Sequence, residues 1–385
     1  MNVKLLGIID EDPFDAHTWS GSSLYFFNAL KSADVLYRAI SAYPPTIIRT
    51  AYKILSIQAG YQKWRFRYHL NTGLFDQMTA AARSVIDNLD TNEFNTILQV
   101  GAWYNLTDTR GKTFVSYHDG NLAVRLKSPY GYPEIRQKYI DRAYEYEKNL
   151  YAGMDYIFPM SKWLARSFIE DFDVNARKVI PVGAGINLPR IMEPAEKNAG
   201  NHKILFVGVD FERKGGQVLL DAFSNVRKKI RGVELNIVGP AHIENLPDGA
   251  RCLGRISKQT DEGLDKLLKL YSEASIFVLP SLYEPFGIAF AEAMAHKLPC
   301  IGSSICAMPE IIDEGVNGFL VEPNNSKSLE DRILMLLGDN SLRESMGEAA
   351  YRKYYNNYRW DIVTGKITGV LESGASRPVV LKKPV

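Results

Sequence analysis

The 385-residue sequence is poor in cysteine and contains no long apolar run. Its three cysteines, Cys252, Cys300 and Cys306, stand in no zinc or redox spacing, so we expect neither a disulfide framework nor a structural zinc site. No apolar segment approaches the length that spans a membrane, and the segment M-N-V-K-L-L-G-I-I-D at the start lacks a signal peptide's cleavage site. These absences predict a cytoplasmic protein, because a reducing compartment suits unpaired thiols.

The sequence also lacks an excess of charge of one sign. It has 46 basic and 44 acidic residues, and the formal net charge of +2 gives no overall reason to expect nucleic acid as a partner. Locally, no acidic residue occurs between Val35 and Phe75. The basic residues of that stretch lie among many aromatics and are Arg38, Arg49, Lys53, Lys63, Arg65 and Arg67. Two interpretations stay open: a surface for anionic lipid on the inner face of the plasma membrane, or an ordinary exposed face whose Lys and Arg stems cover apolar neighbours.

Strand and helix signals alternate along a chain that is long enough for two domains. The expected strands are Val3–Ile9, Thr96–Val100, Phe114–Tyr117 and Tyr156–Phe158 in the first half, and Lys203–Val207, Glu234–Val238, Ser275–Leu279 and Pro299–Gly302 in the second. The pattern predicts an α/β protein with two doubly wound parallel-sheet (Rossmann-like) domains that face one cleft. Ligands of such sheets bind beyond the carboxyl ends of the strands.

The expected domain boundaries follow from where this periodicity stops. We expect a first domain over residues 1–185 and a second over residues 203–358, joined by a polar, proline-containing linker over residues 186–202. Leu342 to Ser373 is mostly helical in pattern, with a break near Asn356–Asn357. Residues 374–385 have no pattern that predicts structure, and we expect a flexible tail there.

The segment E-P-F-G-I-A-F-A-E, from Glu284 to Glu292, is the most informative in the chain. It follows the expected strand Ser275–Leu279, and Gly287 frees the backbone before a helix predicted over Ile288–Lys297. One carboxylate therefore lies in a strand-to-helix loop and the other lies about a turn and a half into the helix. The amide groups that begin a helix attract an anion. An acid on each side of an anion site predicts a nucleotide sugar as ligand, although two such Glu are also common on solvated helices.

A second strand–turn–helix segment, F-V-G-V-D-F-E-R-K-G-G, runs from Phe206 to Gly216. Arg213 and Lys214 would put two cations where a diphosphate binds, while Gly215 and Gly216 would let the backbone approach a ligand. Breaking a sugar–phosphate bond leaves negative charge on the diphosphate, and positive groups held there stabilise the transition state. Two cations and a helix N-terminus would do this without a metal, so we expect no metal site and no cofactor. The alternative is an Arg-Lys pair that faces solvent.

Three further polar features follow predicted strands. His118 ends the apolar strand T-F-V-S-Y, where a histidine either faces the cleft or is structural. Two D-x-D strings also occur, and metal-dependent transferases of another fold use such pairs. Asp171–Asp173 lies at a helix end before a predicted strand and is interpreted as a capping turn. Asp10–Asp12 follows the first strand and could contact an acceptor.

The segment around Glu284 also carries a resemblance to a known family. P-S-L-Y-E-P-F-G-I-A-F-A-E-A-M-A-H-K-L-P-C-I-G-S, followed by P-E-I-I-D-E-G-V-N-G-F-L-V-E-P, resembles the retaining glycosyltransferases of the large family four in their bacterial form. These enzymes have the GT-B fold and an E-x7-E motif. Weaker resemblance extends from W-S-G at Trp19–Gly21 to the helix near Trp360. It implies that a helix at about 360–373 crosses back onto the first domain.

The resemblance implies roles for individual residues. Glu292 would hold the ribose hydroxyls of the nucleotide, and Glu284 would bind a hydroxyl of the donor sugar. Lys214 and Arg213 would bind the diphosphate, with Arg213 standing in for an arginine that the family often carries and this chain lacks. His118 would contact the donor sugar or its leaving phosphate. Further contacts with the donor are implied at Gly21, Arg255, Ile256, Phe286, Gly287 and Ile288.

These features and the resemblance to family four together imply a retaining, metal-independent hexosyltransferase. It would move a sugar from a UDP- or GDP-sugar to a hydroxyl of a saccharide or lipid-linked acceptor, in the synthesis of a cell-surface polysaccharide or glycolipid. No residue resembles a double-displacement nucleophile, so retention would come from attack on the face that the phosphate leaves. Two alternatives remain: a sugar phosphorylase or nucleotide-sugar hydrolase on the same fold, and a non-catalytic module that binds nucleotide sugars.

Overall fold

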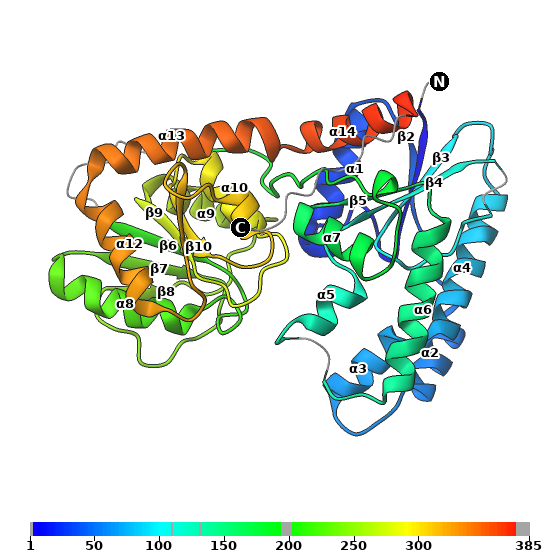
Figure 1. Cartoon of the computed structure of the whole chain (residues 1–385), viewed down its shortest axis with the longest axis horizontal. Coiled ribbons are helices and arrows are strands. Elements are labelled where there is room, and N and C mark those ends of the chain that lie inside the picture. Colours follow the sequence, from blue (N-terminus) through cyan, green and yellow to red (C-terminus); the bar gives the residue numbers. More distant parts are fainter. Residues whose placement is uncertain (1–2, 109–110, 131–132, 194–201, 375–385) are drawn as a thin grey trace. The chain divides into compact units, whose positions relative to one another are not determined.

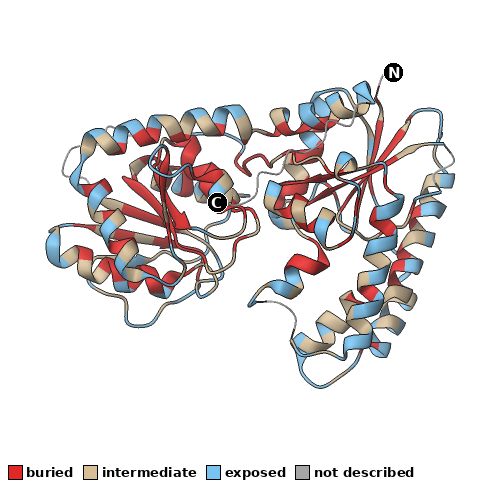
Figure 2. Ribbon diagram, in the orientation of Figure 1, coloured by how far each residue is buried: buried red, intermediate tan, exposed pale blue. Residues whose placement is uncertain are grey.

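The structure is a computed structural model that describes residues 3–108, 111–130, 133–193 and 202–374. The chain divides into two compact units: unit 1 comprises Met1–Gly183 and Trp360–Val385, and unit 2 comprises Ala184–Arg359. Each unit is a parallel sheet covered by helices (Figure 1). In both units the most buried residues lie in the strands and on the helix faces turned toward them (Figure 2).

The sheet of unit 1 has the order β2-β1-β3-β4-β5, with every neighbouring pair parallel. Its strands are β1 (Leu5–Ile9), β2 (Leu36–Ser41), β3 (Thr96–Val100), β4 (Thr113–His118) and β5 (Tyr156–Pro159). The chain goes from β1 to the edge strand β2, and then crosses to β3 on the other side of β1. The loops after β1 and β3 therefore diverge at a topological switch point, where sheets of this kind bind ligands.

Helices of unit 1 alternate with these strands, as the sequence predicts for a doubly wound sheet. They are the 3-10 helix η1 (Thr18–Gly21), α1 (Ser22–Ser32), α2 (Thr46–Leu55), α3 (Tyr61–His69), α4 (Thr72–Asp87), α5 (Leu122–Lys127), α6 (Gln137–Gly153), α7 (Lys162–Glu170), the 3-10 helix η2 (Ala176–Lys178) and α14 (Trp360–Ser373). Helix α14 packs beside α1, where the ring of Trp360 lies 5.7 Å from the ring of Phe26. Val363 and Ile367 of α14 are fully buried there.

The sheet of unit 2 has the order β11-β10-β9-β6-β7-β8, again with parallel neighbours. Its strands are β6 (Lys203–Val207), β7 (Glu234–Val238), β8 (Ala250–Cys252), β9 (Ile276–Leu279), β10 (Cys300–Ser303) and β11 (Gly318–Val321). Strands β6 to β8 build one half, and the chain then returns to place β9 on the other side of β6. The switch point of this sheet thus lies between β6 and β9.

The helices of unit 2 follow the same alternation. They are α8 (Gly216–Lys229), α9 (Asp261–Glu273), α10 (Ile288–Ala295), α11 (Met308–Ile311), α12 (Ser326–Gly338) and α13 (Asn340–Asn357). Helices α8 and α12 lie side by side, and α10 packs against α13 (Figure 1). Within the residues that the structure describes, no helix is both long and apolar enough to cross a bilayer.

Most expected strands are present with small changes at their ends. Three have the predicted bounds, namely Thr96–Val100, Lys203–Val207 and Glu234–Val238, whereas the first begins at Leu5 rather than Val3. The sequence missed β2, β8 and β11. Strand β2 lies at an edge with most of its residues half-buried or exposed, and β8 has only three residues, so neither has a clear apolar pattern. The predicted cap of α7 is confirmed, because Ser161 accepts a hydrogen bond from the backbone N–H of Leu164 at 3.0 Å.

The boundary between the units differs from the expected one. The described start of the expected linker, residues 186–193, belongs to unit 2. Leu188 is buried, and the backbone oxygen of Glu193 accepts a hydrogen bond from Ser272 Oγ at 2.8 Å. The sequence analysis did not predict these contacts, because the polar composition of the segment is typical of a linker. Residues 194–201 of that linker, and residues 375–385 of the expected tail, lie outside the described residues.

Candidate functional site

The switch point of unit 2 brings together the two segments that the sequence singled out. The loop of residues 208–215 follows β6, and the loop of residues 280–287 follows β9. Because β6 and β9 are neighbours in the sheet, both loops leave from the same edge. The backbone N–H of Leu282 donates to the carbonyl of Arg213 at 2.8 Å, which ties one loop to the other.

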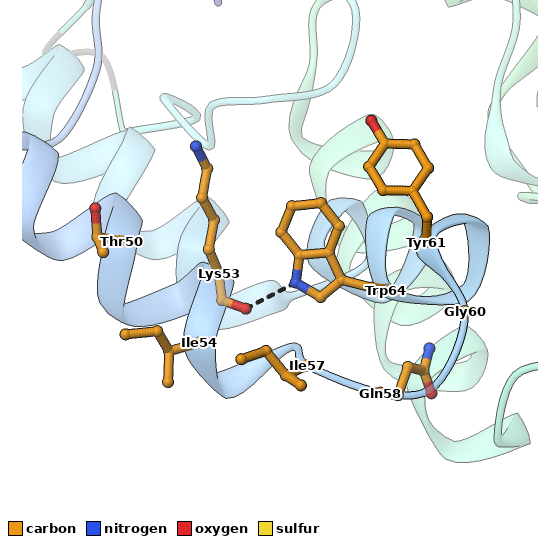
Figure 3. Close-up of a pocket in the computed structure, with 8 residues that line it drawn as sticks. All are labelled: Thr50, Lys53, Ile54, Ile57, Gln58, Gly60, Tyr61 and Trp64. Carbon is orange, nitrogen blue, oxygen red and sulfur yellow. Dashed lines mark hydrogen bonds between the residues drawn. The ribbon is translucent and has the colours of Figure 1, made fainter.

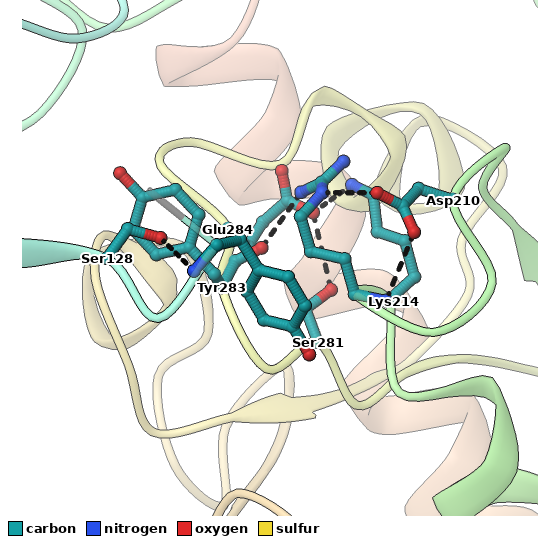
Figure 4. Close-up of polar contacts among 8 residues, drawn as sticks. Ser128, Asp210, Lys214, Ser281, Tyr283 and Glu284 are labelled. Atoms are coloured by element: carbon teal, nitrogen blue, oxygen red, sulfur yellow. Dashed lines mark hydrogen bonds and ion pairs between the residues drawn. The ribbon is translucent and has the colours of Figure 1, made fainter. Parts of the chain in front are cut away.

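Lys214 and Glu284 form an ion pair at this edge (Figure 4). Their side chains are only 13% and 8% exposed, so the pair is largely shielded from water. Ser281 Oγ donates a second hydrogen bond to the same carboxylate, Glu284 Oε2, at 3.3 Å. The two residues predicted to meet the diphosphate and the donor sugar are therefore in direct contact, one from each loop.

Arg213 occupies a bridging position between the two loops. Its Nε donates to Asp210 Oδ2 at 3.1 Å, and its Nη1 donates to the carbonyl of Tyr283 at 2.9 Å. The guanidinium thus holds the loop that carries Glu284 while its side chain remains 25% exposed. This arrangement suits a residue that positions the site, and the predicted contact of Arg213 with diphosphate stays a prediction.

The paired glycines after Lys214 have close neighbours within unit 2, and their predicted role in the approach of a ligand stays a prediction. Gly215 has φ +71°, and a Cβ there would lie 1.9 Å from the carbonyl oxygen of Pro280. A Cβ on Gly216 would lie 2.1 Å from a ring carbon of Phe211. The sequence analysis assigned these glycines to the approach of a ligand. In the structure Gly215 permits the close approach of the two loops that makes the Lys214–Glu284 pair, whereas Gly216 leaves room for the Phe211 ring of its own loop.

Helix α10 begins directly after the second loop and carries Glu292. Gly287, with φ +82°, is its N-cap, and the amide groups of the first turn point out of the helix toward the loop. Glu292 is 2% exposed and is held by two side chains. Lys258 Nζ lies 2.5 Å from Glu292 Oε1, and Tyr271 donates its hydroxyl to Glu292 Oε2 at 3.1 Å.

Lys258 is a site residue that the sequence analysis missed. It follows β8 in the loop of C-L-G-R-I-S-K, two residues beyond Ile256, and no spacing rule distinguishes it from a solvent-facing lysine. In the same loop Arg255 is exposed and Ile256 is half-buried. The ion pair of Lys258 with Glu292 brings the predicted base-binding loop to the predicted ribose-binding residue.

Phe286 and Ile288 flank Gly287 at the start of α10. Phe286 is buried and packs edge-on against Tyr358 at 6.1 Å between ring centroids. Its side chain is thus part of the core of unit 2, which leaves its backbone as the group that can meet a ligand. The predicted backbone contacts at Phe286, Gly287 and Ile288 are untested, but all three stand at the N-terminus of α10.

His118 lies inside unit 1 rather than on an open surface. Its ring is 2% exposed and packs against Tyr151 and Phe168, at 5.5 and 5.0 Å between centroids. Its Nε2 lies 2.8 Å from Ser116 Oγ. Burial lowers the pKa of His118 to about 3, so the ring is neutral near pH 7. This packing agrees with the structural alternative for His118, because β4 carries the ring into the aromatic core, and its implied contact with the donor stays a prediction.

The W-S-G segment lies at the switch point of unit 1 and has an unusual backbone. Trp19 and Ser20 have φ of +48° and +56°, and Gly21, the N-cap of α1, has φ +88°. Two consecutive non-glycine residues in the left-handed region store strain, which is typical of functional loops. The Trp19 side chain hydrogen-bonds Asp119, the residue after His118, and its ring meets Tyr117 edge-on at 5.4 Å.

The two D-x-D strings differ in their surroundings. Asp171 is the C-cap of α7 and accepts hydrogen bonds from Ser167 and Lys127, which agrees with a capping turn. The segment after it forms η2 rather than the strand that we expected. Asp10 follows β1 at the switch point of unit 1, where burial raises the pKa of its carboxyl to about 7. Asp12 is exposed and accepts a hydrogen bond from the N–H of Phe14 at 2.9 Å.

The structure therefore collects the predicted residues into one cluster in each unit. In unit 2, Arg213, Lys214, Glu284 and the start of α10 surround the switch point, and Lys258 joins Glu292 beside them. In unit 1, the Trp19–Asp119 hydrogen bond links the loop of Gly21 to the loop that follows His118. The cluster of unit 2 combines two Lys–Glu pairs with a helix N-terminus, which together suit a ligand that carries both phosphate and hydroxyl groups.

The part of the chain that carries this cluster matches a known family model. Residues 189–353 match the family model described as glycosyl transferases group 1. An uncharacterised glycosyltransferase of Methanocaldococcus jannaschii is 35% identical over 171 residues, which are 43% of this chain and 44% of that protein. The phosphatidyl-myo-inositol mannosyltransferase of Mycobacterium leprae is 33% identical over 182 residues, 45% of this chain and 47% of that protein. The chain thus spans about half the length of the curated relatives it matches.

Solved structures match nearly the whole chain in fold. A sucrose-phosphate synthase from Thermosynechococcus elongatus superposes with a TM-score of 0.69 over 97% of this chain and 100% of that chain, at 15% identity. HepE of Anabaena, solved in complex with UDP, superposes with a TM-score of 0.66 over 96% of this chain and 100% of that chain, also at 15% identity. These structural neighbours share the GT-B fold, as the sequence predicted. Residues 189–353 therefore match the model of the glycosyl transferases group 1 family, in a chain whose two parallel-sheet α/β units have the GT-B fold.

Proposed function

We propose that the chain is a retaining, metal-independent glycosyltransferase that moves a hexose from a nucleotide sugar to an acceptor hydroxyl. The observation that carries this proposal is the shielded Lys214–Glu284 pair at the switch point between β6 and β9, directly before the N-terminus of α10. A cation, a helix N-terminus and a carboxylate at one sheet edge match the parts of a sugar diphosphate. The family of residues 189–353 supports the same reaction class.

In this proposal the nucleotide sugar replaces contacts that the site makes with itself. The diphosphate lies at the N-terminus of α10 and takes Lys214 Nζ as a partner, since a phosphate carries more negative charge than a carboxylate. Glu284 is then released to accept a hydrogen bond from a sugar hydroxyl. Glu292 likewise receives the ribose hydroxyls in place of Lys258. Arg213 keeps the loop of Glu284 in position through the carbonyl of Tyr283.

The chemical step needs charge stabilisation rather than a protein nucleophile. The bond between the anomeric carbon and the phosphate oxygen breaks, and its electron pair stays on the diphosphate. Lys214 and the amide groups of α10 stabilise that developing charge in a shielded site. The acceptor hydroxyl attacks from the face that the phosphate leaves and gives its proton to the departing phosphate, so configuration is retained. With these cationic groups in place, we expect no requirement for a divalent metal.

The proposed donor is a UDP- or GDP-sugar, and the proposed acceptor is a saccharide or a lipid-linked acceptor. The UDP bound to HepE and the mannosyltransferase among the relatives support this range of donors and acceptors. A relative from Staphylococcus aureus named for capsular polysaccharide biosynthesis, 28% identical over 42% of this chain, supports a role in cell-surface polysaccharide or glycolipid synthesis. We propose a cytoplasmic location with peripheral contact at the inner face of an anionic membrane. The unpaired thiols of Cys252, Cys300 and Cys306 suit that compartment.

Product analysis tests the proposal. The enzyme is first screened by thermal shift with UDP-, GDP- and ADP-sugars, because a ligand that binds only the folded state raises the melting temperature. The best donor is then incubated with trial acceptors, and the anomeric configuration of the product is read by nuclear magnetic resonance. Retention of configuration in a new glycoside supports the proposal. Free sugar or a sugar phosphate as sole product would indicate a hydrolase or phosphorylase, and binding without any product would indicate a non-catalytic module.

Two further arms of the same assay test the residue roles. Glu284→Gln should lower turnover strongly while titration calorimetry still detects binding of the nucleoside diphosphate, because Glu284 is proposed to meet the sugar. Loss of that binding in a folded variant would contradict this role. EDTA should leave activity largely intact. A loss of activity that magnesium or manganese restores would contradict the metal-independent step and would make Asp10 and Asp12 candidate metal ligands.

A further inference from the structure

Helix α2 presents apolar side chains to water on a face that no described element covers. None of its residues is buried, although it has isoleucine and leucine at five positions between Ile47 and Ile57 when the turn after it is included. The exposed apolar residues of α2 and the turn into α3 are Ile47 at 79%, Ile54 at 61%, Leu55 at 62%, Ile57 at 62% and Tyr61 at 66%. We name this set the outer apolar edge.

The outer apolar edge is distinct from the face that packs on the core. Tyr52 is half-buried and packs against the hydrophobic core of unit 1, and Ile48, one turn before it, is half-buried as well. Ile47 and Ile54 are seven residues apart and lie about 100° or more around α2 from Ile48 and Tyr52. The helix thus has one wide apolar face, of which one flank packs on the core and the other flank is exposed. A surface helix of a soluble protein needs only the packed flank, so the exposed apolar flank marks a surface for a partner.

Side-chain hydrogen bonds fix the shape of this edge. Trp64 donates its indole N–H to the carbonyl of Lys53 at 2.9 Å, which joins α3 to the end of α2 (Figure 3). Gln58 Nε2 donates to the carbonyl of Lys63 at 2.5 Å, and Arg67 Nη1 donates to the carbonyl of Ile57 at 3.0 Å. These bonds hold a groove of about 380 Å³ between α2 and α3, lined by Ile54, Ile57, Tyr61 and Trp64 among others. The apolar edge is therefore presented in a preformed geometry rather than by a loose loop.

The charged residues of the α2–α3 segment itself are all basic. No acidic residue lies between Val35 and Phe75, and Lys53 and Arg65 are exposed there. Lys63 is half-buried and lies 3.8 Å from Glu134, whose own side chain is 95% exposed. By contrast, Arg49 and Arg67 lie over the rings of Tyr43 and Tyr139, so they are engaged within unit 1. Lys53 and Arg65 are exposed cations, and Lys63 shares its charge only with a highly exposed glutamate that another anion can replace, so the partner's complementary charge is negative.

We propose that the α2–α3 hairpin docks on the surface of an anionic lipid bilayer. The outer apolar edge enters the boundary between headgroups and acyl chains, while Lys53, Lys63 and Arg65 meet the headgroup phosphates. An apolar edge flanked by cations, with Tyr61 and Trp64 beside it, has the composition of helices that lie in a membrane interface. The α2–α3 hairpin is thus the surface of the proposed membrane contact, with the outer apolar edge as its apolar part and the three cations as its charged part. It does not depend on glycosyl transfer.

Co-sedimentation of the full chain with vesicles, without nucleotide or acceptor, tests the proposal. Wild type should sediment with phosphatidylcholine vesicles that contain phosphatidylglycerol, and more weakly with phosphatidylcholine alone. Ile54→Ser/Ile57→Ser should weaken binding about tenfold or more at both low and high salt, since apolar burial is not screened. Lys53→Ser/Lys63→Ser/Arg65→Ser should weaken binding by roughly a hundredfold at low salt, about fivefold for each cation, and by much less at high salt.

Matched variants in unit 2 provide the controls. Val316→Ser/Met335→Ser removes two side chains that are 56% and 45% exposed, and Lys228→Ser/Arg231→Ser/Lys266→Ser removes three exposed cations. Both should sediment as wild type does, and all variants should melt at the wild-type temperature because the changed residues are largely exposed. Failure of wild type to bind anionic vesicles would overturn the proposal, as would unchanged binding of Ile54→Ser/Ile57→Ser. A dimer in sedimentation velocity that this double variant dissociates would make a second copy the occupant, and would also overturn it.

Discussion

At the scale of single residues, the site of unit 2 is held by charge pairs whose partners come from different segments. Lys214 pairs with Glu284 across two loops, and Lys258 pairs with Glu292 from a loop to a helix. Each glutamate of the E-x7-E segment therefore has a lysine partner in this structure. A buried pair is costly to break by removing one partner, because the remaining charge is left in a poorly solvated place. Ligand binding avoids this penalty only if it supplies a new partner for each freed group.

This predicts that stability and catalysis respond differently to changes of the Lys214–Glu284 pair. Lys214→Met should lower the free energy of unfolding by up to about 3 kcal/mol, because it leaves Glu284 unpaired. It should also lower kcat/KM by about 30-fold to 1000-fold, which corresponds to the roughly 2–4 kcal/mol that one such group contributes to a transition state. Lys214→Met/Glu284→Gln should regain much of the stability and none of the activity. Urea unfolding and steady-state kinetics measure the two effects.

The exposed residue Lys228 gives the control for this experiment. Lys228→Met should leave both stability and kcat/KM near the wild-type values, since Lys228 is exposed on α8. If Lys214→Met lowers kcat/KM by less than about tenfold, Lys214 does not meet the developing charge, and the diphosphate site lies elsewhere.

His118 makes a prediction about pH that is independent of its role in catalysis. Burial holds its pKa at about 3 in the folded chain, against an ordinary value of 6.5. Below pH 6.5 the imidazole of His118 therefore binds a proton in the unfolded chain, whereas in the folded chain it stays neutral down to about pH 3. The stability that this neutral ring contributes is present above pH 6.5 and is lost as the pH falls, by about 2 kcal/mol between pH 7 and pH 5.

The variant His118→Gln isolates this effect, because an amide can keep the hydrogen bond to Ser116 and does not titrate. Asp10 and Glu147, whose pKa values burial raises to about 7, favour the folded chain as the pH falls and oppose His118. The measurement is therefore the difference in unfolding free energy between variant and wild type at pH 7 and pH 5. Wild type should lose about 2 kcal/mol relative to His118→Gln over that interval. An equal pH dependence of the two proteins would place His118 in contact with water.

At the scale of elements, local sequence patterns predicted the features that depend on neighbouring residues, namely buried strands and a helix cap. Strands that are largely buried, such as β3 and β6, have the predicted bounds, and Ser161 caps α7 as expected. The edge strand β2 and the three-residue β8 were missed, because their place in the sheet comes from long-range pairing and their own residues are half exposed. Lys258 could not be predicted for the same reason: its contact with Glu292 spans 34 residues and depends on the sheet order.

The loop between β6 and α8 depends on the absence of a side chain at Gly215. Gly215→Ala should destabilise unit 2 more than Gly232→Ala, although both glycines have positive φ, of +71° and +77°. A Cβ at Gly232 meets nothing within 4 Å, so that variant measures only the left-handed backbone, about 1 kcal/mol. A Cβ at Gly215 would lie 1.9 Å from Pro280 O, which forces the two loops apart and should add about 1–3 kcal/mol.

The same pair of variants reports on the site. Gly215→Ala should weaken binding of the nucleoside diphosphate, because the displaced loop carries Lys214, whereas Gly232→Ala should bind as wild type does. Urea unfolding and titration calorimetry give the two readouts. Equal losses of stability in both variants would mean that the loops separate easily, and that the contact at Pro280 does not hold the site.

At the scale of the whole molecule, the chain returns to unit 1 after unit 2 is complete. Helix α14 follows α13 directly in sequence, yet Trp360 packs on Phe26 and Ile367 is fully buried in unit 1. Unit 1 is therefore built from two segments on either side of unit 2 in the sequence, and it cannot be complete before α14 is made. The resemblance implied this crossing helix, whereas the helical pattern of Leu342 to Ser373 alone gives no reason to divide it between two units.

This arrangement predicts that stability can be changed in one unit at a time. Ile367→Ala should lower the protection of backbone amides against hydrogen exchange throughout unit 1, by about 3 kcal/mol, because the side chain is fully buried. Ile54→Ala makes the same change at a side chain that is 61% exposed in the same unit, and should have little effect. A nucleoside diphosphate at about a hundred times its Kd should instead raise protection in unit 2 by about 2.7 kcal/mol. Exchange measured by mass spectrometry resolves the two units by peptide. If Ile367→Ala lowered protection equally over Ala184–Arg359, α14 would stabilise both units as one cooperative body, and the division of the chain at Arg359 would not describe how it unfolds.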